Sequence, residues 1–596
     1  MSAREQIVYH RETEIFKEQI IIANSHHIVF HRDRIIKRLK MFVYKKRIVH
    51  HRDRNTERTN QQNVGTGAYS LYAVSSTSSG SYKPGVVAST SESTKTSTSI
   101  NNMNPIIGFA FLILVGWKLY QKWRLPKNFP PGPRSLPVLG AIHHLSDNLL
   151  ESFLHLRSKY GNIFGLRIGP TPTVVISDFH TCVKVFKDAN FSARPTYLTE
   201  VMGSVMSRPE DDPSPNRGIV FSSGKVWDEQ RKFILKKLSE FGVGKSRLEE
   251  TVTEQVEMLV KLLRKDSTKG NVKLGERFSV SLVNSIWNIV TGSQFDLEDP
   301  LIHSIYKGID RFIDSHRLIG VFMVFPWLRH IVSYLGGALN KMKEDVRNMM
   351  KNIVDDHIDL STGYDKDLVD SYITKMSETT DTTSSFFGRK GRTNLEQNML
   401  ELFGAGANPV ATTLSFCFLY LAKNPKLQEK IFQEIDENVG TGYAISMEDV
   451  HKLPYTNAFI HEIMRITAIN FIGTPHMNFK DAKIGEYNVP AGTTVFSFLW
   501  YIMNDPTYWK SPREFIPERF IENGEFVKDE RLIPFLVGRR QCIGMALAQT
   551  EMFLFFSNLV REFRFSESSS VPLPAPTPTM GFVMGCPEYE IKIEDR

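Results

Sequence analysis

Cysteine is scarce in this chain of 596 residues, which contains only Cys182, Cys417, Cys542 and Cys586. Four cysteines over this length do not form the dense framework of a small secreted protein, so a disulfide scaffold is not predicted and a reducing compartment is favoured. No Gly-x-Gly-x-x-Gly fingerprint occurs either. A fused nucleotide-binding domain is therefore not expected within the chain.

Most of the sequence carries no net charge. The formal net charge is +8, but residues 1–100 hold 16 Lys and Arg against 8 Asp and Glu and so carry all of it. The other residues contain 57 charges of each sign. A folded body that binds nucleic acid would need a basic surface, so that function has little support.

Long apolar runs are also rare, and the strongest one is short. Residues 103–117 carry no charge, whereas a membrane span needs about 20 apolar residues. Interfacial Trp117 and Trp123, together with the lysines Lys118 and Lys122, would extend this run. We expect a membrane anchor helix at residues 103–120, with a buried helix as the alternative. The basic residues after it place the downstream body in the cytosol.

The chain on either side of the anchor has a biased composition. Residues 1–60 are basic and residues 61–102 are rich in Ser, Thr and Gly, so residues 1–102 are expected to be a disordered extension. Its acidic residues argue against an organellar transit peptide, which leaves a membrane-surface arm or an artefact of gene prediction with Met103 as the natural initiator. Residues 121–135 are basic and rich in proline, which predicts a stiff hinge.

Residues 136–596 are predicted to form one large catalytic domain. Apolar residues recur at helical spacing, as at Val252, Val256 and Leu259. Short strand-like runs occupy 163–168, 173–176 and 493–498. The expected fold class is mainly α with small β-sheets.

The most informative motif is a glycine-bent loop around one cysteine, read as Phe535-x-x-Gly538-x-Arg540-x-Cys542-x-Gly544. A cysteine binds a metal as the thiolate, and a thiolate on haem iron favours O–O cleavage. Glycines let backbone turn tightly and lie against a flat macrocycle. The alternative is a structural cysteine in a basic loop, but five fixed positions within ten residues argue against it.

This loop resembles the haem-binding loop of the cytochrome P450 family, the haem-thiolate monooxygenases. The resemblance implies a cytochrome P450-like fold and haem b, with Cys542 as the iron ligand, Phe535 shielding the sulfur and Arg540 pairing with a haem propionate. It covers about residues 103–596. The run from Gly218 to Gly224 before Trp227 is similar to animal microsomal members.

Further motifs appear in the order that the family shows. Glu462 and Arg465 form Glu-x-x-Arg at helical i, i+3 spacing, and Arg519 follows in Pro-Glu-Arg-Phe. The resemblance implies that the three form a structural triad behind the haem loop. Trp227 and Arg231 stand at i, i+4, where an indole N–H and a guanidinium together suit a carboxylate. By resemblance these two, with His476, hold haem propionates.

The predicted long helix at 397–422 departs from the family pattern Ala-Gly-x-(Asp/Glu)-Thr-Thr. Aligned on the cofactor-contacting Ala405 and Gly406, the acid position is Asn408 and the key threonine position is Pro409. O₂ cleavage needs protons, and neither residue supplies one. Asn408 can orient water, and Thr412, one turn further on, is a candidate replacement.

Three interpretations remain open. The enzyme inserts one oxygen atom of O₂ into a lipophilic small molecule, such as a steroid, fatty acid, terpenoid or xenobiotic, and relays protons through water and Asn408 or Thr412. Alternatively, it isomerises or dehydrates a peroxide or endoperoxide, which already contains the O–O bond. A non-enzymatic haem sensor is the third. The first is favoured because the surrounding chain resembles ordinary monooxygenases.

The resemblance also implies partners and a location. Electrons would come from NADPH through a separate flavoprotein reductase on the same membrane, and the endoplasmic reticulum membrane would carry the enzyme with its catalytic domain facing the cytosol. An apolar pocket indicates a lipophilic ligand. Its expected lining comprises Leu198, Val201, Met202, Val205, Met206, Phe312, Phe322 and Phe325.

Overall fold

The computed structural model describes residues 124–203, 214–241, 246–300, 302–304, 306–307, 325, 328, 337–359, 366–440, 444–568, 570–581 and 583–596. The predicted extension at 1–102 and the predicted anchor at 103–120 lie outside these residues, as do Val205, Met206, Phe312 and Phe322. The chain divides into the units Met1–Asn102 and Met103–Arg596, and every described residue belongs to the second.

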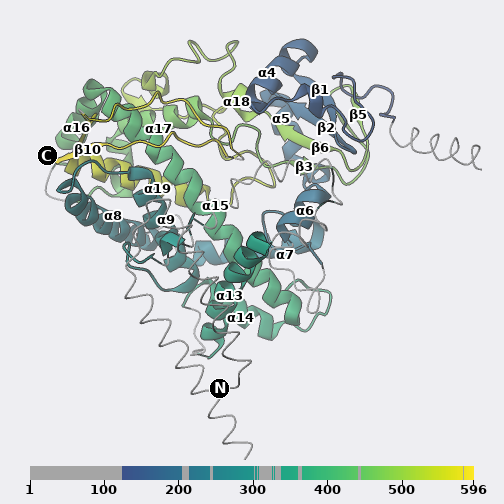
Figure 1. Ribbon diagram of the computed structural model, residues 1–596, viewed down its shortest axis with the longest axis horizontal. Coiled ribbons are helices and arrows are strands. Elements are labelled where there is room, and N and C mark those ends of the chain that lie inside the picture. Colours follow the sequence, from purple (N-terminus) through teal and green to yellow (C-terminus); the bar gives the residue numbers. More distant parts are fainter. Residues whose placement is uncertain are drawn as a thin grey trace, which may run out of the picture. The chain divides into compact units, whose positions relative to one another are not determined.

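Helices dominate the described part of the chain, as predicted from the apolar periodicity (Figure 1). The α-helices are α4 (Leu149–Tyr160), α5 (Phe179–Lys187), α6 (Thr196–Gly203), α7 (Gly224–Glu240), α8 (Ser246–Ser267), α9 (Leu274–Thr291), α13 (Gly337–Asp359), α14 (Leu368–Glu378), α15 (Gly388–Lys423), α16 (Pro425–Asn438), α17 (Pro454–Thr467), α18 (Leu499–Met503) and α19 (Met545–Glu562). Short 3₁₀ helices are η1 (Ile142–His144), η2 (Ala189–Phe191), η3 (Met447–Lys452) and η4 (Pro517–Phe520).

The sheets are small, which confirms the predicted fold class. The strands are β1 (Ile163–Ile168), β2 (Thr171–Ile176), β3 (His476–Met477), β4 (Ala482–Ile484), β5 (Tyr487–Val489), β6 (Thr494–Ser497), β7 (Ile521–Glu522), β8 (Glu525–Phe526), β9 (Phe563–Ser566) and β10 (Lys592–Asp595). The largest sheet has the order β1-β2-β6-β3, in which β2 and β6 are parallel and the other pairs antiparallel. The other pairs are β9 with β10, β4 with β5, and β7 with β8.

The long helix α15 is the central element, and it contacts α9, α13, α14, α16, α17 and α19. It begins at Gly388, earlier than the sequence pattern predicted, and runs through Pro409. Among the described residues it is the one helix long and apolar enough to cross a membrane, but most of that stretch is buried within the protein. Its apolar character therefore reflects a core position.

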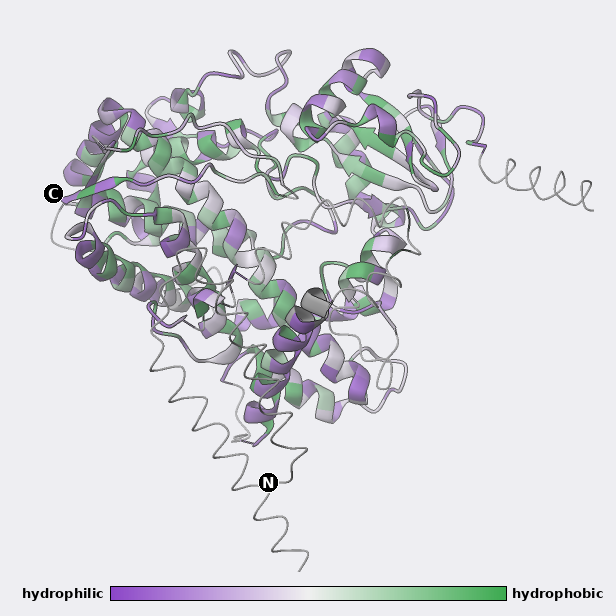
Figure 2. Ribbon diagram, viewed as in Figure 1, coloured by the Kyte–Doolittle hydropathy of each residue, from purple (hydrophilic) through white to green (hydrophobic). Residues whose placement is uncertain are grey.

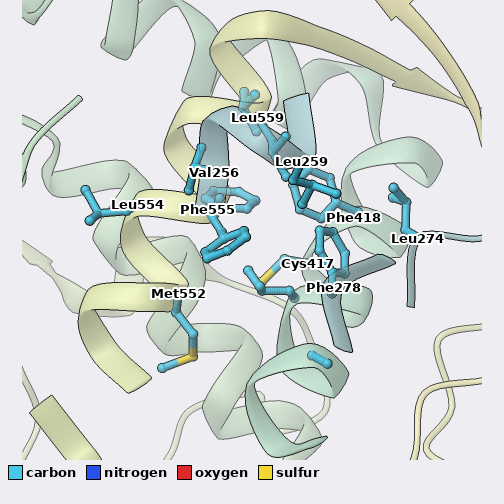
Figure 3. Packing of buried hydrophobic residues seen from close by; sticks show 14 of the residues in the cluster. Val256, Leu259, Leu274, Phe278, Cys417, Phe418, Met552, Leu554, Phe555 and Leu559 are labelled. Atoms are coloured by element: carbon cyan, nitrogen blue, oxygen red, sulfur yellow. The ribbon is translucent and has the colours of Figure 1, made fainter. Parts of the chain in front are cut away.

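The main hydrophobic core forms where four helices meet. Val256 of α8, Phe278 of α9, Phe418 of α15 and Phe555 of α19 are all buried in one cluster (Figure 3). Hydrophobic residues gather between the helices, and hydrophilic ones lie on the outer faces of α8 and α16 (Figure 2). The apolar positions Val252, Val256 and Leu259 predicted from helical spacing are buried. Burial of each such side chain contributes about 1.5–3 kcal/mol.

Local signals in the sequence explain where several helices begin. Asn148 before α4 accepts a hydrogen bond from the Glu151 N–H, and Asp178 before α5 accepts one from the Thr181 N–H. Such side chains satisfy N–H groups that have no partner within the helix. Proline opens α17 at Pro454, where a missing N–H costs nothing. The start of each of these helices is thus set by residues close by in the sequence.

Candidate functional site

The Cys542 loop turns sharply before α19. The Cys542 N–H donates to the Phe535 carbonyl at 3.0 Å. Gly538 has φ +86°, and a Cβ there would lie 2.0 Å from the Phe186 carbonyl oxygen, so only glycine fits. Gly544, by contrast, has nothing within 4 Å of a Cβ position. The loop therefore needs Gly538 to press against α5 and leaves open space beside Gly544.

Cys542 itself is exposed, whereas Cys182 and Cys417 are buried. Surrounding protein raises the pKa of the Cys542 thiol, while a hydrogen bond from the Gly544 N–H and the charge of Arg231 act to lower it. A donor N–H and a cation beside a sulfur stabilise the thiolate that binds a metal. The sulfur is thus accessible and has two groups that favour its ionised form.

Arg540, two residues before the cysteine, is buried against α7. Its guanidinium lies 3.9 Å from the centre of the Trp227 ring. It donates to the carbonyls of Ser192 at 2.8 Å and Ser222 at 2.6 Å. The Trp227 indole N–H is buried and has no partner in the described part of the chain. Arg231, one turn along α7, donates to the Gln541 carbonyl at 2.6 Å.

His476 reaches the same place from the edge of the largest sheet. Its strand, β3, pairs with Ala193 through Met477, which brings Arg194 beside it. The Nδ1–H of His476 donates to the Phe191 carbonyl at 2.8 Å, and the buried Nε2 has no partner among the described residues. Arg194 donates to the carbonyls of Val220 at 2.8 Å and Pro475 at 2.9 Å.

These residues form a cationic cluster of Arg194 and Arg540, which are buried, and Arg231, which is partly buried. Burial lowers the pKa of Arg540 well below its usual range, and Arg194 and Arg231 lower it further. Burial lowers the pKa of Arg194 to about 9, opposed by Glu401. Burial, and then Arg194 and Arg540, also lower the pKa of His476 well below its ordinary value. An anion bound here would oppose these effects, because a nearby negative charge favours the charged form of each arginine.

The cluster fits the two propionate groups of haem. Two buried polar atoms, Trp227 Nε1 and His476 Nε2, await partners, and buried polar groups rarely stay unpaired. A carboxylate at His476 would need a protonated Nε2, and its charge would raise the depressed pKa of this residue. If haem is bound here, a thiolate at Cys542 would supply the electron donation that favours O–O cleavage.

Glu462, Arg465 and Arg519 lie together. The Nε of Arg465 is 2.7 Å and the Nε of Arg519 is 3.0 Å from Glu462 Oε2. Arg465 also donates to the carbonyls of Met503 and Pro512, both at 3.0 Å. Glu462 and Arg465 are fully buried. One carboxylate thus joins α17, η4 and the irregular segment between them.

On α15, the two predicted cofactor contacts, Ala405 and Gly406, have different surroundings. Ala405 is exposed on a helix that is otherwise largely buried. A Cβ on Gly406 would lie 2.2 Å from Ile286 Cδ1, so this glycine lets α9 approach closely. Thr412 Oγ1 lies 3.5 Å from Asn408 Oδ1, a distance too long for a strong hydrogen bond. The Thr413 hydroxyl donates to the Pro409 carbonyl at 2.9 Å.

Two residues of this region were absent from the sequence predictions. Arg194 carries no recognisable spacing to His476, because the two meet only through the pairing of Ala193 with Met477 of β3. Glu401 is the last acidic residue of α15 before its long apolar stretch, and that contrast was a usable signal. Its Oε2 accepts from the N–H groups of Ile219 and Val220, both at 2.7 Å. Burial raises the pKa of Glu401 to about 7.

The sequence model of the family described as cytochrome P450 matches residues 130–593. The chain belongs to the cytochrome P450 family. The predicted family and enzyme class, a cytochrome P450-type monooxygenase, are therefore confirmed. Members of this family bind haem through a cysteine thiolate, and Cys542 lies in the matched region.

Curated P450 proteins resemble the chain over most of its length. Cytochrome P450 2J2 of Homo sapiens is 32% identical over 455 residues, which cover 75% of this chain and 87% of the relative. Farnesoate epoxidase of Bombyx mori is 31% identical over 485 residues, covering 78% and 94%. Cytochrome P450 2L1 of Panulirus argus is 31% identical over 490 residues, covering 80% and 97%.

Proposed function

We propose that this P450 inserts one oxygen atom of O₂ into a lipophilic small molecule, using electrons from NADPH delivered by a flavoprotein reductase. Cys542 would ligate the haem iron. Arg194, Trp227, Arg231, His476 and Arg540 would hold the propionates. Farnesoate epoxidase, a relative by sequence, acts on farnesoate by its name, which supports a lipophilic substrate class here.

One observation carries this proposal: the cluster of Arg194, Arg231 and Arg540 lies next to the one exposed cysteine among the described residues. Arg231 connects the two, because its guanidinium both contacts the Gln541 carbonyl at 2.6 Å and acts on the Cys542 sulfur. The orphaned Trp227 N–H and His476 Nε2 face the same cluster of cations. A planar ligand with a metal and two carboxylates satisfies all of these groups together.

Apolar side chains in the described part support a lipophilic substrate. Leu198 and Met202 pack with Tyr197 and Phe221 in one cluster. Phe325 belongs to the cluster of the largest sheet. Apolar residues that line a site favour apolar ligands, with few polar anchors to fix orientation.

A carbon monoxide difference spectrum of the reduced protein tests thiolate ligation. We expect the thiolate signature in the parent protein and its loss in Cys542→Ser. Cys586→Ser is the matched control. Cys586 is half-buried in the same domain, but it packs against the main hydrophobic cluster, so its replacement should leave the spectrum unchanged. A thiolate signature that persists in Cys542→Ser would overturn the ligand assignment.

Turnover with reductase present separates the three functional interpretations. NADPH-dependent oxygenation of lipophilic compounds, followed by metabolite profiling, is the expected outcome. Turnover of lipid peroxides without any NADPH-dependent product would favour a peroxide isomerase or dehydratase. Asn408 and Pro409 are compatible with that reaction, because its substrate already contains the O–O bond. Haem binding with neither activity would favour the sensor.

We also propose that residues 103–120 anchor the enzyme in the endoplasmic reticulum membrane, with the domain at 136–596 in the cytosol and the hinge at 121–135 between them. Met103 would be the natural initiator. The experiment is N-terminal sequencing of the native protein after carbonate extraction of microsomes. Peptides from residues 1–100 would contradict the initiator, and release by carbonate would contradict the anchor.

A further inference from the structure

A short segment before α7, Gly218–Ser222, is bonded to α15 through its N–H groups. The N–H groups of Ile219 and Val220 both donate to Glu401 Oε2, each at 2.7 Å. Two successive backbone donors therefore share one carboxyl oxygen. This arrangement fixes the path of the segment along α15, because both N–H groups would be left unpaired if the segment moved away.

The carbonyl groups of the same segment bond the arginines of the cationic cluster. Arg194 Nε donates to the Val220 carbonyl at 2.8 Å. Arg540 donates to the carbonyls of Ile219 at 3.3 Å and Ser222 at 2.6 Å. The peptide unit between Ile219 and Val220 thus bonds a carboxyl group through its N–H and a guanidinium through its C=O. Hydrogen bonds joined in this way polarise and strengthen one another.

The carboxyl group of Glu401 is held tightly in this position. It is buried, and its Oε1 accepts from Gln397 Nε2 at 3.0 Å. Gly218 has φ +81°, and a Cβ there would lie 2.5 Å from Glu401 Oε2. Only glycine therefore fits beside this carboxyl group, which cannot move aside without breaking its own hydrogen bonds.

Glu401 also acts electrostatically on the two buried arginines. Burial lowers the pKa of Arg194 to about 9, and Glu401 opposes that effect. The pKa of Arg540 is lowered well below its usual range, first by burial and then by its neighbouring arginines, and Glu401 again opposes the shift. The acid is therefore linked to both arginines, and the Gly218–Ser222 segment is the physical connection.

We propose that Glu401 is a positioning residue for haem: its carboxyl group holds the Gly218–Ser222 segment in the path from which Arg194 and Arg540 bind the propionates. The inference rests on the proposed haem site. Glu401 acts through the segment and does not touch the cofactor. It lies about one turn before Ala405 on α15, so the helix with this predicted cofactor contact also fixes the propionate site.

The test compares Glu401→Ala with Glu401→Gln in the holoenzyme. Gln keeps an oxygen that can accept from both N–H groups, whereas Ala leaves them without a partner. We expect Glu401→Ala to lose haem to an excess of an apo-acceptor protein several-fold faster than the parent. Glu401→Gln should stay close to the parent rate. A parental rate in Glu401→Ala would overturn the proposal.

Glu396→Ala separates positioning from a general effect on folding. Glu396 is a buried acid of the same helix that pairs with Arg392 at 3.1 Å. Its removal should lower the free energy of unfolding but leave haem loss from the folded protein near the parent rate. If Glu396→Ala loses haem as fast as Glu401→Ala, the role of Glu401 is general stabilisation and positioning is refuted.

A purely electrostatic role for Glu401 predicts the opposite change in haem loss. A negative charge near the propionates would repel them, so both Glu401→Ala and Glu401→Gln would then hold haem more tightly than the parent. That result would contradict positioning. Gly218→Ala tests the same contact from the other side, should Glu401→Ala not fold. Its Cβ would displace the carboxyl group, and we expect faster haem loss; a parental rate would count against the proposal.

Resonance Raman spectroscopy gives a readout that does not depend on turnover. The propionate bending band responds to the hydrogen bonds of the propionates, so it should shift in Glu401→Ala and stay in place in Glu401→Gln and Glu396→Ala. If the shift is found while no substrate is oxidised with NADPH and reductase, the proposed function fails and positioning stands. Oxygenation by the parent, with no shift in Glu401→Ala, would refute positioning alone.

Discussion

The guanidinium of Arg540 lies 3.9 Å from the centre of the Trp227 ring, and the indole N–H of Trp227 has no partner among the described residues. The stacking fixes the orientation of the indole, because a cation over an aromatic face is attracted to it. Arg540 meanwhile uses its N–H groups on the carbonyls of Ser192, Ile219 and Ser222. The pair thus presents one unused donor beside a buried positive charge.

Trp227→Phe is expected to weaken haem retention. The variant keeps an aromatic face for Arg540 but removes the N–H proposed to bond a propionate. A hydrogen bond to a charged group contributes about 1.5–3 kcal/mol, so haem loss to an excess of an apo-acceptor protein should be roughly 10- to 100-fold faster. Trp287→Phe is the control, since its N–H bonds Ser293 at 3.0 Å. Equal rates in both variants would contradict the propionate role.

Glu462→Ala is expected to destabilise the domain strongly. Glu462 is fully buried and pairs with both Arg465 and Arg519. Its removal leaves buried charge uncompensated, which costs about 3–5 kcal/mol in the free energy of unfolding measured with denaturant. Lys265→Ala breaks an exposed 2.8 Å pair with Glu298 and should change the free energy of unfolding far less, because solvent screens exposed ion pairs. Similar losses of unfolding free energy in the two variants would show that the buried triad stabilises the domain no more than an exposed ion pair does.

Glu401→Gln is expected to change how stability depends on pH. Burial raises the Glu401 pKa to about 7, so the folded state binds a proton more tightly than the unfolded state. The resulting stabilisation is complete below pH 4.5 and is lost as the pH rises to about 7, by about 3 kcal/mol. Glu401→Gln lacks this loss. Its unfolding free energy relative to the parent should therefore rise across that window and stay level above it. A pH-independent difference between the two proteins would contradict the raised pKa.

Thr412→Val and Thr413→Val are expected to differ in coupling. The Thr413 hydroxyl is engaged with the Pro409 carbonyl at 2.9 Å, whereas Thr412 lies 3.5 Å from Asn408 Oδ1 and keeps a hydroxyl able to bind water. If Thr412 helps to relay protons, Thr412→Val lowers product per NADPH several-fold and Thr413→Val leaves it near the parent value. The reverse order would move the relay to Thr413.

The double variant Asn408→Glu with Pro409→Thr restores an acid and a hydroxyl to α15. Because general acid groups near the reaction accelerate proton transfer, product per NADPH should increase. The single variant Pro409→Ala, which adds an N–H but no hydroxyl, is the control. Lower coupling in the double variant would show that this chain has adapted fully to the residues it carries.

Much of the site was predictable because its signals are local. The Phe535–Gly544 loop, the Glu462–Arg465 spacing and the Trp227–Arg231 spacing each depend on ten residues or fewer and on helical or turn geometry. The position of Gly538, with φ +86°, is likewise set by the turn itself. The helix α15 was located by its apolar run, although its start at Gly388 was not, because helix ends depend on local capping as well as composition.

What the sequence by itself determined was the family, the helical class with small sheets, the cysteine proposed to bind iron and the missing acid–threonine pair at Asn408 and Pro409. Tertiary structure alone decided which distant groups meet. Arg194 lies beside His476 because Met477 of β3 pairs with Ala193. Glu401 accepts a hydrogen bond from the Ile219 N–H. Such contacts depend on burial and chain crossing, which no short-range pattern encodes.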